Sequence, residues 1–324
     1  MIKRFENEKY LDYMIRVINA VKNGEIDYND MGNLLLEDDN CYSFDNLRKA
    51  YYVLNKICEK ANEQPSNVKN RILCLSDFHV PFQLPVETYE KFRFITDTLV
   101  LNGDLVDFNQ ISKFSKVCRD TPMDDLVETR QYLIDLIRYI DPKDIYITIG
   151  NHERRFESYL DKNIGNDLIN LMPKSPIDYI VCDGLPYYDH QNHSKIFYEP
   201  LKEIFPDKKF HYSGNWYCQI GNTIFAHPSA FSGAILKTAE RATQWFRNER
   251  CDFSTLCLAH THRSGSFAMG GCSEIIEQGC CCDVARNNYR EAMLVNEQKE
   301  GFVYLCHDEN GDAIRELTQR VVLN

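Results

Sequence analysis

The sequence predicts an α/β fold, because short apolar runs alternate with helical segments along most of the chain. Five runs have the composition of buried strands and end in polar residues: RILCLSD, TLVLNGD, DIYITIGN, NTIFAHP and STLCLAH. Segments with helical spacing of apolar residues lie between the first three runs, at residues 87–96 and 123–140, and before the last, at residues 234–247. Strands and helices that alternate in this way favour a sheet covered by helices.

The two ends of the chain differ from this pattern. Apolar residues recur at helical spacing within residues 11–21 and 47–57, and residues 61–70 are polar and contain a proline. We therefore predict a helical module over residues 1–65 and a second domain over residues 71–324. Near the C-terminus, two apolar stretches flank Asn310 and Gly311, which predicts a hairpin.

Composition limits the classes of partner. The net charge of −11 argues against a generic surface for nucleic acids or other polyanions, although bound divalent cations could supply local positive charge. The first ten residues are charged and lack an apolar core, and no run of 18 apolar residues occurs, so neither a secretory signal nor a membrane span is expected. A cytoplasmic location follows as the expectation.

The 13 cysteines are expected to be reduced thiols, because their number is odd and their spacing irregular. Cys280, Cys281 and Cys282 are consecutive, which invites a metal-site interpretation. Neighbouring residues on a strand point to opposite faces, so three such cysteines cannot converge on one ion. Buried strand residues are the expectation for this run.

Potential metal ligands follow each of the five predicted strands. Because ligands of α/β folds sit at the carboxyl ends of strands, these residues are expected to gather at one edge. Carboxylate, amide and imidazole groups together suit Mn, Fe, Zn or Ni better than an ion with oxygen ligands alone. The groups are Asp77-x-His79, Gly103-Asp104-x-x-Asp107, Gly150-Asn151-His152-Glu153, His227 and His260-x-His262.

The spacing within these groups is informative. Residues two apart face the same way on a strand, but where a strand gives way to a loop they can splay toward two neighbouring ions. Gly103 and Gly150 each precede a candidate ligand, where a sharp turn or a close approach of backbone to substrate would require glycine.

In this order, the five groups resemble the signature of the calcineurin-like metallophosphoesterase superfamily, from about residue 71 to the C-terminus. Each group alone is weak evidence, whereas five in order, each behind a predicted strand, are specific. Ala226 and Ala259 stand where the family often has glycine, a small change in side-chain size. The resemblance implies a four-layer α/β/β/α sandwich, and it looks closest to bacterial and bacteriophage members.

The resemblance also implies two divalent metal ions, with Mn²⁺ expected first and Fe, Zn, Ni or Mg as alternatives. Two cations about 3.5–4 Å apart can lower the pKa of a water between them, so that hydroxide is available for in-line attack on a phosphoester. One ion would be held by Asp77, His79, Asp104 and His262, and the other by Asp104, Asn151, His227 and His260, with Asp104 as the bridge.

Residues beside the ligands are assigned supporting roles. By resemblance, His152 is not a ligand and would contact the phosphate or protonate the leaving oxygen. Asp107 would orient His152 or one of the ligands. Arg154 or Arg155 could bind a substrate phosphate, or both could be solvated in the first turn of the following helix.

An insertion is predicted over residues 162–212. Its location near the metals suits substrate selection, and its aromatic residues could either stack on a base or pack the insertion itself. His190 and His193 are expected to be loop residues. The aromatic residues in question are Tyr187, Tyr188, Phe197 and Tyr198.

The expected activity is hydrolysis of a phosphoester, favoured as a phosphodiesterase on a nucleotide or nucleic acid. Phe108 stands where phosphoprotein phosphatases usually have arginine, which weakens that assignment. A phosphomonoesterase is the alternative, and a non-catalytic scaffold is disfavoured because every ligand is retained. The choice between a nuclease and an enzyme of small nucleotides stays open.

The N-terminal helices have two possible roles. Arg48, Lys49 and Lys56 could face DNA, as in a helix-turn-helix module. Acidic residues slightly outnumber basic ones over residues 1–70, so packing or oligomerisation through these helices is the favoured alternative.

Overall fold

The computed structural model describes residues 10–22, 25–27, 67–112, 121–165, 168, 175–189, 192–269, 272–287 and 298–323. The chain forms two compact units, residues 1–66 and 67–324. In the first unit, α1 (Tyr10–Lys22) matches the helix expected over residues 11–21. The second helix expected there, and with it Arg48, Lys49 and Lys56, lies outside the described residues. No helix in the described ranges has the length and apolar character needed to cross a membrane.

The larger unit contains a six-stranded sheet in the order β13-β12-β1-β2-β3-β6. The four strands β1, β2, β3 and β6 are parallel, and β12 and β13 run antiparallel at one side. Three of the five predicted strands, those that precede Asp77, Asp104 and Asn151, are neighbours in this sheet. The bounds are β1 Asn70–Leu75, β2 Thr98–Asn102, β3 Asp144–Thr148, β6 Lys209–Tyr212, β12 Gly301–His307 and β13 Gln319–Val322.

A second sheet has five strands in the order β10-β11-β9-β8-β7. Its inner strands β8, β9 and β11 are parallel, and they include the remaining two predicted strands. The bounds are β7 Tyr217–Ile220, β8 Thr223–Ala226, β9 Thr255–Leu258, β10 Ser264–Met269 and β11 Cys272–Gln278.

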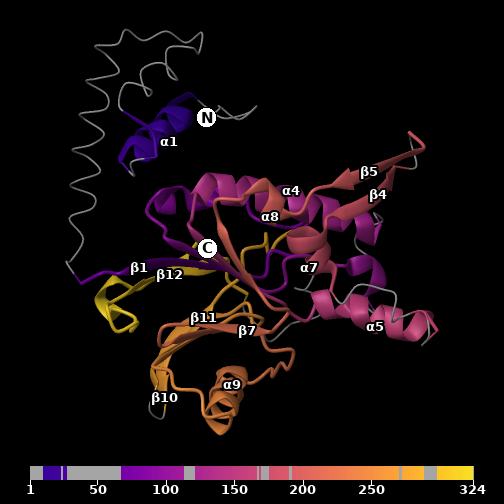
Figure 1. Ribbon diagram of the computed structural model, residues 1–324. Coiled ribbons are helices and arrows are strands. Elements are labelled where there is room, and N and C mark those ends of the chain that lie inside the picture. Colours follow the sequence, from indigo (N-terminus) through magenta and orange to yellow (C-terminus); the bar gives the residue numbers. More distant parts are fainter. Residues whose placement is uncertain are drawn as a thin grey trace. The chain divides into compact units, whose positions relative to one another are not determined.

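The two sheets pack face to face, with helices on the outer face of each (Figure 1). Buried residues of both sheets form one cluster between them, including Ile72 and Val100 from the first sheet and Phe225 and Ile276 from the second. Helix α4 (Pro122–Ile140) covers the first sheet and α9 (Lys237–Asn248) covers the second. The expected four-layer α/β/β/α sandwich is confirmed.

The predicted helices are observed with corrected bounds and type. Residues 87–96 contain a 3₁₀ helix, η1 (Val86–Phe92), which buries Tyr89 and Phe92. Thr121 is the N-cap of helix α4, and its side chain accepts a hydrogen bond from the backbone N–H of Asp124. Helix α9 starts only at Lys237, since the preceding residue has a left-handed backbone.

The C-terminal hairpin is confirmed, although its connection is longer than expected. Strands β12 and β13 pair antiparallel, with Gly301 opposite Val322. A tight turn does occur at Asn310 and Gly311, but the chain then passes through a short 3₁₀ helix, η4 (Arg315–Leu317), before β13 begins.

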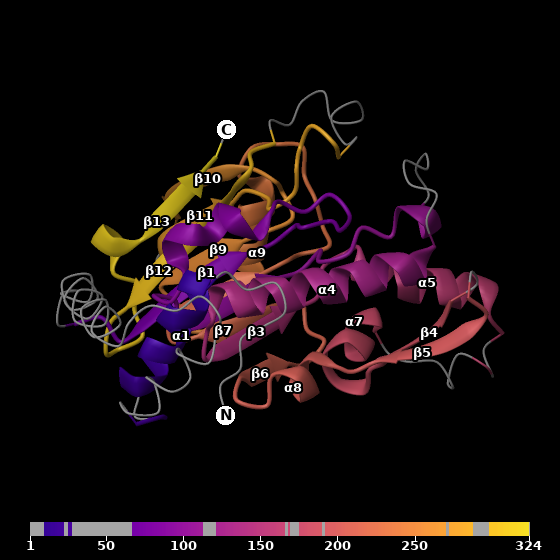
Figure 2. The ribbon, with the colours of Figure 1, turned by 90° about the horizontal axis from the view of Figure 1, so that it is seen from above.

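Residues 162–212 include a hairpin that projects from the sheets (Figures 1 and 2). Tyr187 anchors it by donating a hydrogen bond to Asp124 (2.8 Å), and the Arg130 guanidinium lies over the ring of Tyr198. Tyr188 and Phe197 are exposed, His193 lies in the exposed turn, and His190 is outside the described residues. The elements are α5 Glu153–Asn163, α7 Pro176–Asp178, the π-helical turn η3 Tyr179–Asp183, β4 Leu185–Asp189, β5 Ser194–Tyr198 and α8 Leu201–Ile204.

Candidate metal centre

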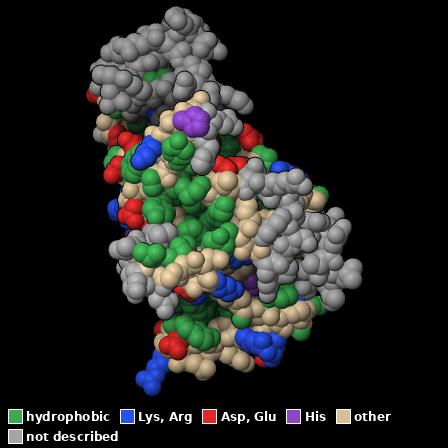
Figure 3. Space-filling view, turned by 90° about the vertical axis from the view of Figure 1, so that its right-hand side faces the viewer, with side chains coloured by type: hydrophobic (Ala, Val, Ile, Leu, Met, Phe, Trp, Pro, Cys, Tyr) green, Lys and Arg blue, Asp and Glu red, His purple; other side chains and the backbone are tan. Residues whose placement is uncertain are grey.

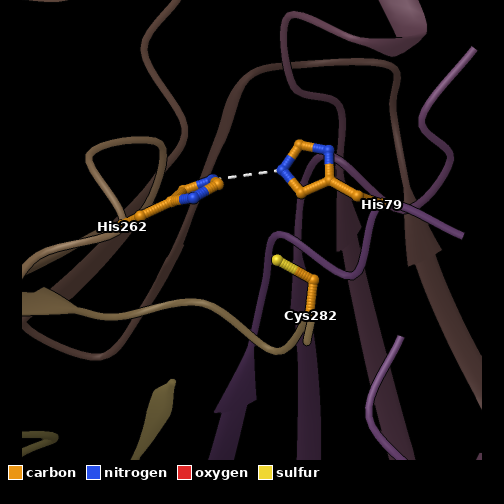
Figure 4. Close-up of side chains that lie close together, drawn as sticks. All are labelled: His79, His262 and Cys282. Carbon is orange, nitrogen blue, oxygen red and sulfur yellow. Dashed lines mark hydrogen bonds between the residues drawn. The ribbon is translucent and has the colours of Figure 1, made fainter. Parts of the chain in front are cut away.

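The predicted ligands meet where strands of both sheets end. The ring of His79 lies beside that of His262, with their Nε2 atoms 3.1 Å apart (Figure 4). Asp77 completes this group, since its Oδ1 lies 3.2 Å from His262 Nε2 and 3.9 Å from His79 Nε2. Two carboxyl-terminal loops, after β1 and after β9, therefore supply one group of three candidate ligands.

A second group forms around Asp104. Ligand atoms of Asp104, His227 and His260 all lie within 4.8 Å of one another, and Asp104 Oδ2 approaches His227 Nε2 to 3.2 Å. The same Asp104 oxygen is 3.9 Å from His79 Nε2, which places this carboxylate between the two groups. Asn151 directly follows Gly150, whose backbone N–H donates a hydrogen bond to the buried Glu153 carboxylate (2.7 Å).

Buried polar atoms without hydrogen bonds show that these residues fit a metal centre. Within the described part of the chain, Asp77 Oδ1, Asn151 Oδ1, His227 Nε2 and His260 Nε2 are buried and have no hydrogen-bond partner. Buried polar groups are normally satisfied, and unsatisfied ones cost about 1–3 kcal/mol each. Four such atoms, all on predicted ligands, are the arrangement expected of residues that coordinate cations.

The electrostatics of the site follow from burying acids and imidazoles together. Burial disfavours the charged form of His227, but the Asp104 and Asp77 carboxylates outweigh it and raise its pKa to about 10. Burial also disfavours the charged form of His262, but the Asp77 carboxylate outweighs this effect and raises the pKa of His262 to about 9. Burial and the neighbouring His227 charge lower the pKa of His260 to about 3. The carboxylates therefore favour positive charge on His227 and His262, whereas burial and the charge of His227 keep His260 neutral.

The ligand pairs lie in loops with an uncommon backbone conformation. Strand β1 ends two residues before Asp77, and β9 ends two residues before His260. Because the pairs are not on extended strands, their side chains can point in different directions, the second of the two arrangements that the spacing allowed. Five candidate ligands have φ in the left-handed region, namely Asp77 (53°), His79 (47°), Asp104 (51°), His260 (76°) and His262 (54°).

Gly103 and Gly150 permit a close approach to ligand side chains. A Cβ atom on Gly103 would lie 2.6 Å from Nδ1 of His227, and its φ of 77° also favours glycine. A Cβ on Gly150 would overlap the Asp104 carboxylate. The sequence predicted a sharp turn or a close approach of the backbone to substrate, whereas the close approach in the structure is to candidate ligands.

Glu153 holds two of the ligand loops together, a role that sequence reasoning missed. Its buried carboxylate accepts hydrogen bonds from the backbone N–H groups of Gly150 (2.7 Å), Asp104 (3.0 Å), Leu105 (2.7 Å) and Val106 (3.3 Å). The loops after β2 and β3 are thereby joined through one side chain. Its position at the start of a helix, directly after a ligand loop, was the available signal.

A second missed group is a buried polar chain between the sheets. Gln278 donates a hydrogen bond to Ser76 (2.6 Å), which in turn donates to Asp77. The oxygen of Gln278 accepts from Asn102 (3.3 Å), whose backbone carbonyl accepts from Nδ1 of His227 (2.7 Å). This chain orients one ligand of each group, and it comes from strands that are distant in sequence.

Asp107, His152 and Arg155 form one cluster. Asp107 Oδ1 lies 3.2 Å from Nδ1 of His152 and 3.3 Å from Nδ1 of His79. Burial opposes ionisation of Asp107, but hydrogen bonds from His152 and His79 hold its pKa well below the usual range. Arg155 approaches His152 Nε2 (2.6 Å) and donates to the Asp107 carbonyl (2.9 Å). Of the two arginines predicted to bind substrate, this one is engaged within the protein.

The family can now be stated from the sequence match. The family model described as calcineurin-like phosphoesterase matches residues 70–264, more than half of the chain. The protein belongs to the calcineurin-like phosphoesterase family. The sequence-based prediction of a hydrolase of phosphoester bonds is thereby confirmed. No curated protein matches the sequence.

Solved structures similar to this phosphoesterase are distant. They include wild-type Vps29 with Zn²⁺ from Entamoeba histolytica (13% identity, 78% of this chain and 99% of that chain, TM-score 0.35). Vps29 from Cryptosporidium parvum has 13% identity and a TM-score of 0.36, and the match covers 79% of this chain and 99% of that chain. A protein described as a novel archaeal phosphodiesterase has 14% identity and a TM-score of 0.35, and the match covers 78% of this chain and 99% of that chain. At these TM-scores the likeness supports no conclusion about activity, and membership depends on the sequence match alone.

A pocket of about 290 Å³ opens beside His227 in this phosphoesterase, lined by residues that directly follow that histidine. Arg154 reaches it, and its Nε is buried without a hydrogen-bond partner in the described structure. Figure 3, which views the right-hand side of Figure 1, shows hydrophobic side chains gathered on one face with both basic and acidic side chains around them. The lining includes Arg154, Trp216, Pro228, Phe231, Arg241 and Trp245.

The cysteine run is buried, as expected, but one member lies beside candidate metal ligands. Cys280, Cys281 and Cys282 follow the end of β11 and are fully buried, and each of them is a free thiol. Cys282 Sγ lies within 4.8 Å of ligand atoms of His79 and His262, whereas Cys280 and Cys281 belong to no such group in the described part of the chain. The prediction that the run has only a packing role is therefore incomplete. Strand β11 is parallel to β9, so its carboxyl end reaches the same edge.

Proposed function

We propose that this phosphoesterase is a phosphodiesterase that acts on a nucleotide or nucleic acid through two divalent metal ions. When bound, the ions would activate water and offset the charge that develops on the phosphoryl oxygens. The orphaned buried atoms of four predicted ligands support this assignment. One ion is assigned to Asp77, His79, Asp104 and His262, and the other to Asp104, Asn151, His227 and His260.

Asp107, His152 and Arg155 are assigned to proton transfer at the leaving oxygen. A guanidinium can only donate hydrogen bonds, so the 2.6 Å contact makes His152 Nε2 an acceptor and leaves the ring proton on Nδ1, which faces Asp107. Release of Arg155 toward a substrate phosphate would free Nε2 to carry a proton to the leaving group. Asp107 keeps the ring in place during that exchange.

The pocket beside His227 is the observation that carries the substrate assignment. Trp216, Trp245 and Phe231 give it aromatic walls, and Arg154 and Arg241 give it two cations. Aromatic side chains stack on bases of any sequence, and guanidinium groups bind phosphate oxygens. A volume of about 290 Å³ is at the lower end for small-molecule sites, which suits one nucleoside unit.

A diester has two organic substituents, and this pocket provides room for one of them next to the metals. Phe108, at the position where the phosphoprotein phosphatases usually have arginine, is buried and stacks on Phe156 at 5.9 Å. It offers no group for a phosphate dianion. Both observations favour the diester over the monoester, which is kept as the alternative.

A substrate panel tests this proposal. Protein loaded with Mn²⁺ is given bis-p-nitrophenyl phosphate, p-nitrophenyl phosphate, cyclic nucleotides and single-stranded DNA. The expected result is a higher kcat/KM for the diester, whereas a preference for the monoester would move the function to a phosphatase. Affinity for DNA that falls steeply with salt would indicate a nuclease, and weak salt dependence an enzyme of small nucleotides.

Two aromatic variants show which surface holds the base. Trp245→Ala should raise KM for a nucleotide diester about 5- to 160-fold, as expected for the loss of base stacking worth ~1–3 kcal/mol. Phe197→Ala, in the projecting hairpin, is the matched control because its ring is more exposed than that of Trp245 (62% against 40%) and lies outside the pocket. A larger effect of Phe197→Ala would place base recognition on the hairpin.

A further inference from the structure

Cys282 lies against the first ligand group although no part of the proposed function uses it. The side chain is fully buried, and Sγ is within 4.8 Å of ligand nitrogens of both His79 and His262. Figure 4 shows the sulfur pointing toward the two imidazole rings. The ligand atoms of a tetrahedral zinc site are roughly 3.3–3.6 Å apart, so small rotations of these side chains would bring the three atoms around one ion.

The chain around Cys282 is fixed to the loop that carries His79. Asp283 donates a backbone hydrogen bond to the Phe82 carbonyl (2.8 Å), and Cys282 pairs with Gln83 in an isolated bridge. Asn287, itself buried, donates a side-chain hydrogen bond to Cys282 Sγ (3.6 Å). An amide N–H can only donate, so the sulfur is held as an acceptor, as metal-bound thiolates are.

An independent observation marks the same point as a cation site. Asp77 Oδ1 is fully buried and has no hydrogen-bond partner in the described structure. It lies 3.2 Å from Nε2 of His262 and 3.9 Å from Nε2 of His79, the two nitrogens that Cys282 also approaches. One carboxylate, two imidazoles and one thiol therefore surround a single position.

We propose that Cys282 supplies a thiolate to the metal ion assigned to Asp77, His79, Asp104 and His262, and that this ion is Zn²⁺ or Fe²⁺ in preference to Mn²⁺. The inference rests on the proposed metal centre and adds one ligand to it. Coordination replaces the S–H bond by a metal–sulfur bond and releases the thiol proton to solvent. Thiolates favour Zn and Fe, whereas Mn suits oxygen ligands. Among the residues that the structure describes, no cysteine joins the group of Asp104, His227 and His260, so the two ions are expected to differ.

Cobalt substitution reads out the sulfur ligand without any assay of activity. Wild-type protein titrated with Co²⁺ should develop the intense near-ultraviolet band of thiolate-to-cobalt charge transfer. Cys282→Ser should lose that band while keeping the weaker visible bands of cobalt bound to nitrogen and oxygen. Cys281→Ser is the control, because this neighbouring thiol is equally buried but donates toward the Gly301 carbonyl (3.7 Å), and it should keep the band.

Metal competition and X-ray absorption complete the test. Preference for Zn²⁺ over Mn²⁺ should fall at least ~10-fold in Cys282→Ser and stay unchanged in Cys281→Ser. If the serine variant does not fold, the zinc absorption edge of wild-type protein should still show a sulfur neighbour at about 2.3 Å. Wild-type protein that binds metal without a charge-transfer band and without a sulfur neighbour overturns the inference. A sulfur ligand in a protein that hydrolyses no diester would instead refute only the proposed function.

Discussion

Replacing Glu153 by Gln tests whether one carboxylate holds the metal loops together. Each carboxylate oxygen of Glu153 accepts two backbone hydrogen bonds. Three of the four donors lie in the loop after β2 and one in the loop after β3. Glutamine has nearly the same shape, but its NH₂ group cannot accept. Whichever way the amide is oriented, two backbone N–H groups then face a donor.

The size of the effect follows from these contacts. Hydrogen bonds to a charged group contribute about 1.5–3 kcal/mol each, so losing two costs roughly 3–6 kcal/mol. Part of this is offset, because burial and the nearby Asp104 raise the pKa of Glu153, which shows that its charge is costly to bury. A net loss of about 3 kcal/mol remains, or a fall in Tm of roughly 6–12 °C for a unit of this size.

Thermal unfolding, followed by circular dichroism with and without added Mn²⁺, measures this loss. Glu157→Gln is the matched control, since Glu157 lies one turn further along the same helix and is only half-buried. Glu153→Gln should also bind less metal, because the Asp104 amide is one of the groups released. Equal Tm values for the two variants would refute the role assigned to Glu153.

Three further substitutions are expected to separate the roles of the site. Asp104→Asn should lower metal content and turnover together, measured by elemental analysis and diester hydrolysis; full activity with both ions retained would contradict the bridging role. His152→Ala should keep the ions and lower kcat about 10²- to 10⁴-fold, whereas loss of metal would make it a ligand or a structural residue. Gly103→Ala should weaken metal binding, since its methyl group would lie 2.6 Å from the His227 ring, and unchanged metal affinity would show that the loop can move.

Much of the fold was predictable because its main signal is local. A short apolar run followed by a polar ligand identifies a buried strand and its carboxyl end, and this held for all five predicted strands. The groups at Asp77, Asp104 and His260 could be placed at one edge without knowing the strand order, since parallel strands present their ends together.

The missed features depend on contacts between distant segments. Strand β11 contains CSEIIEQ, with only two adjacent aliphatic residues, and its place beside β9 arises from pairing that no local pattern encodes. Cys282 lies beside the candidate ligands because it follows the carboxyl end of that strand. Gln278 and Glu153 are buried polar residues whose partners come from segments distant in sequence, and composition alone does not distinguish them from surface residues.

The left-handed backbone of the candidate ligands links function to a limit on stability. A non-glycine residue in this conformation costs about 1 kcal/mol or more, and five such residues are concentrated in one small region. Asp and His tolerate it better than most residues, whereas a β-branched side chain would not. Glycine at any of these positions would relieve the backbone while removing a ligand. A lineage of this fold released from catalysis would therefore be expected to become more stable as it lost its metals, so that inactivity and robustness would arise together.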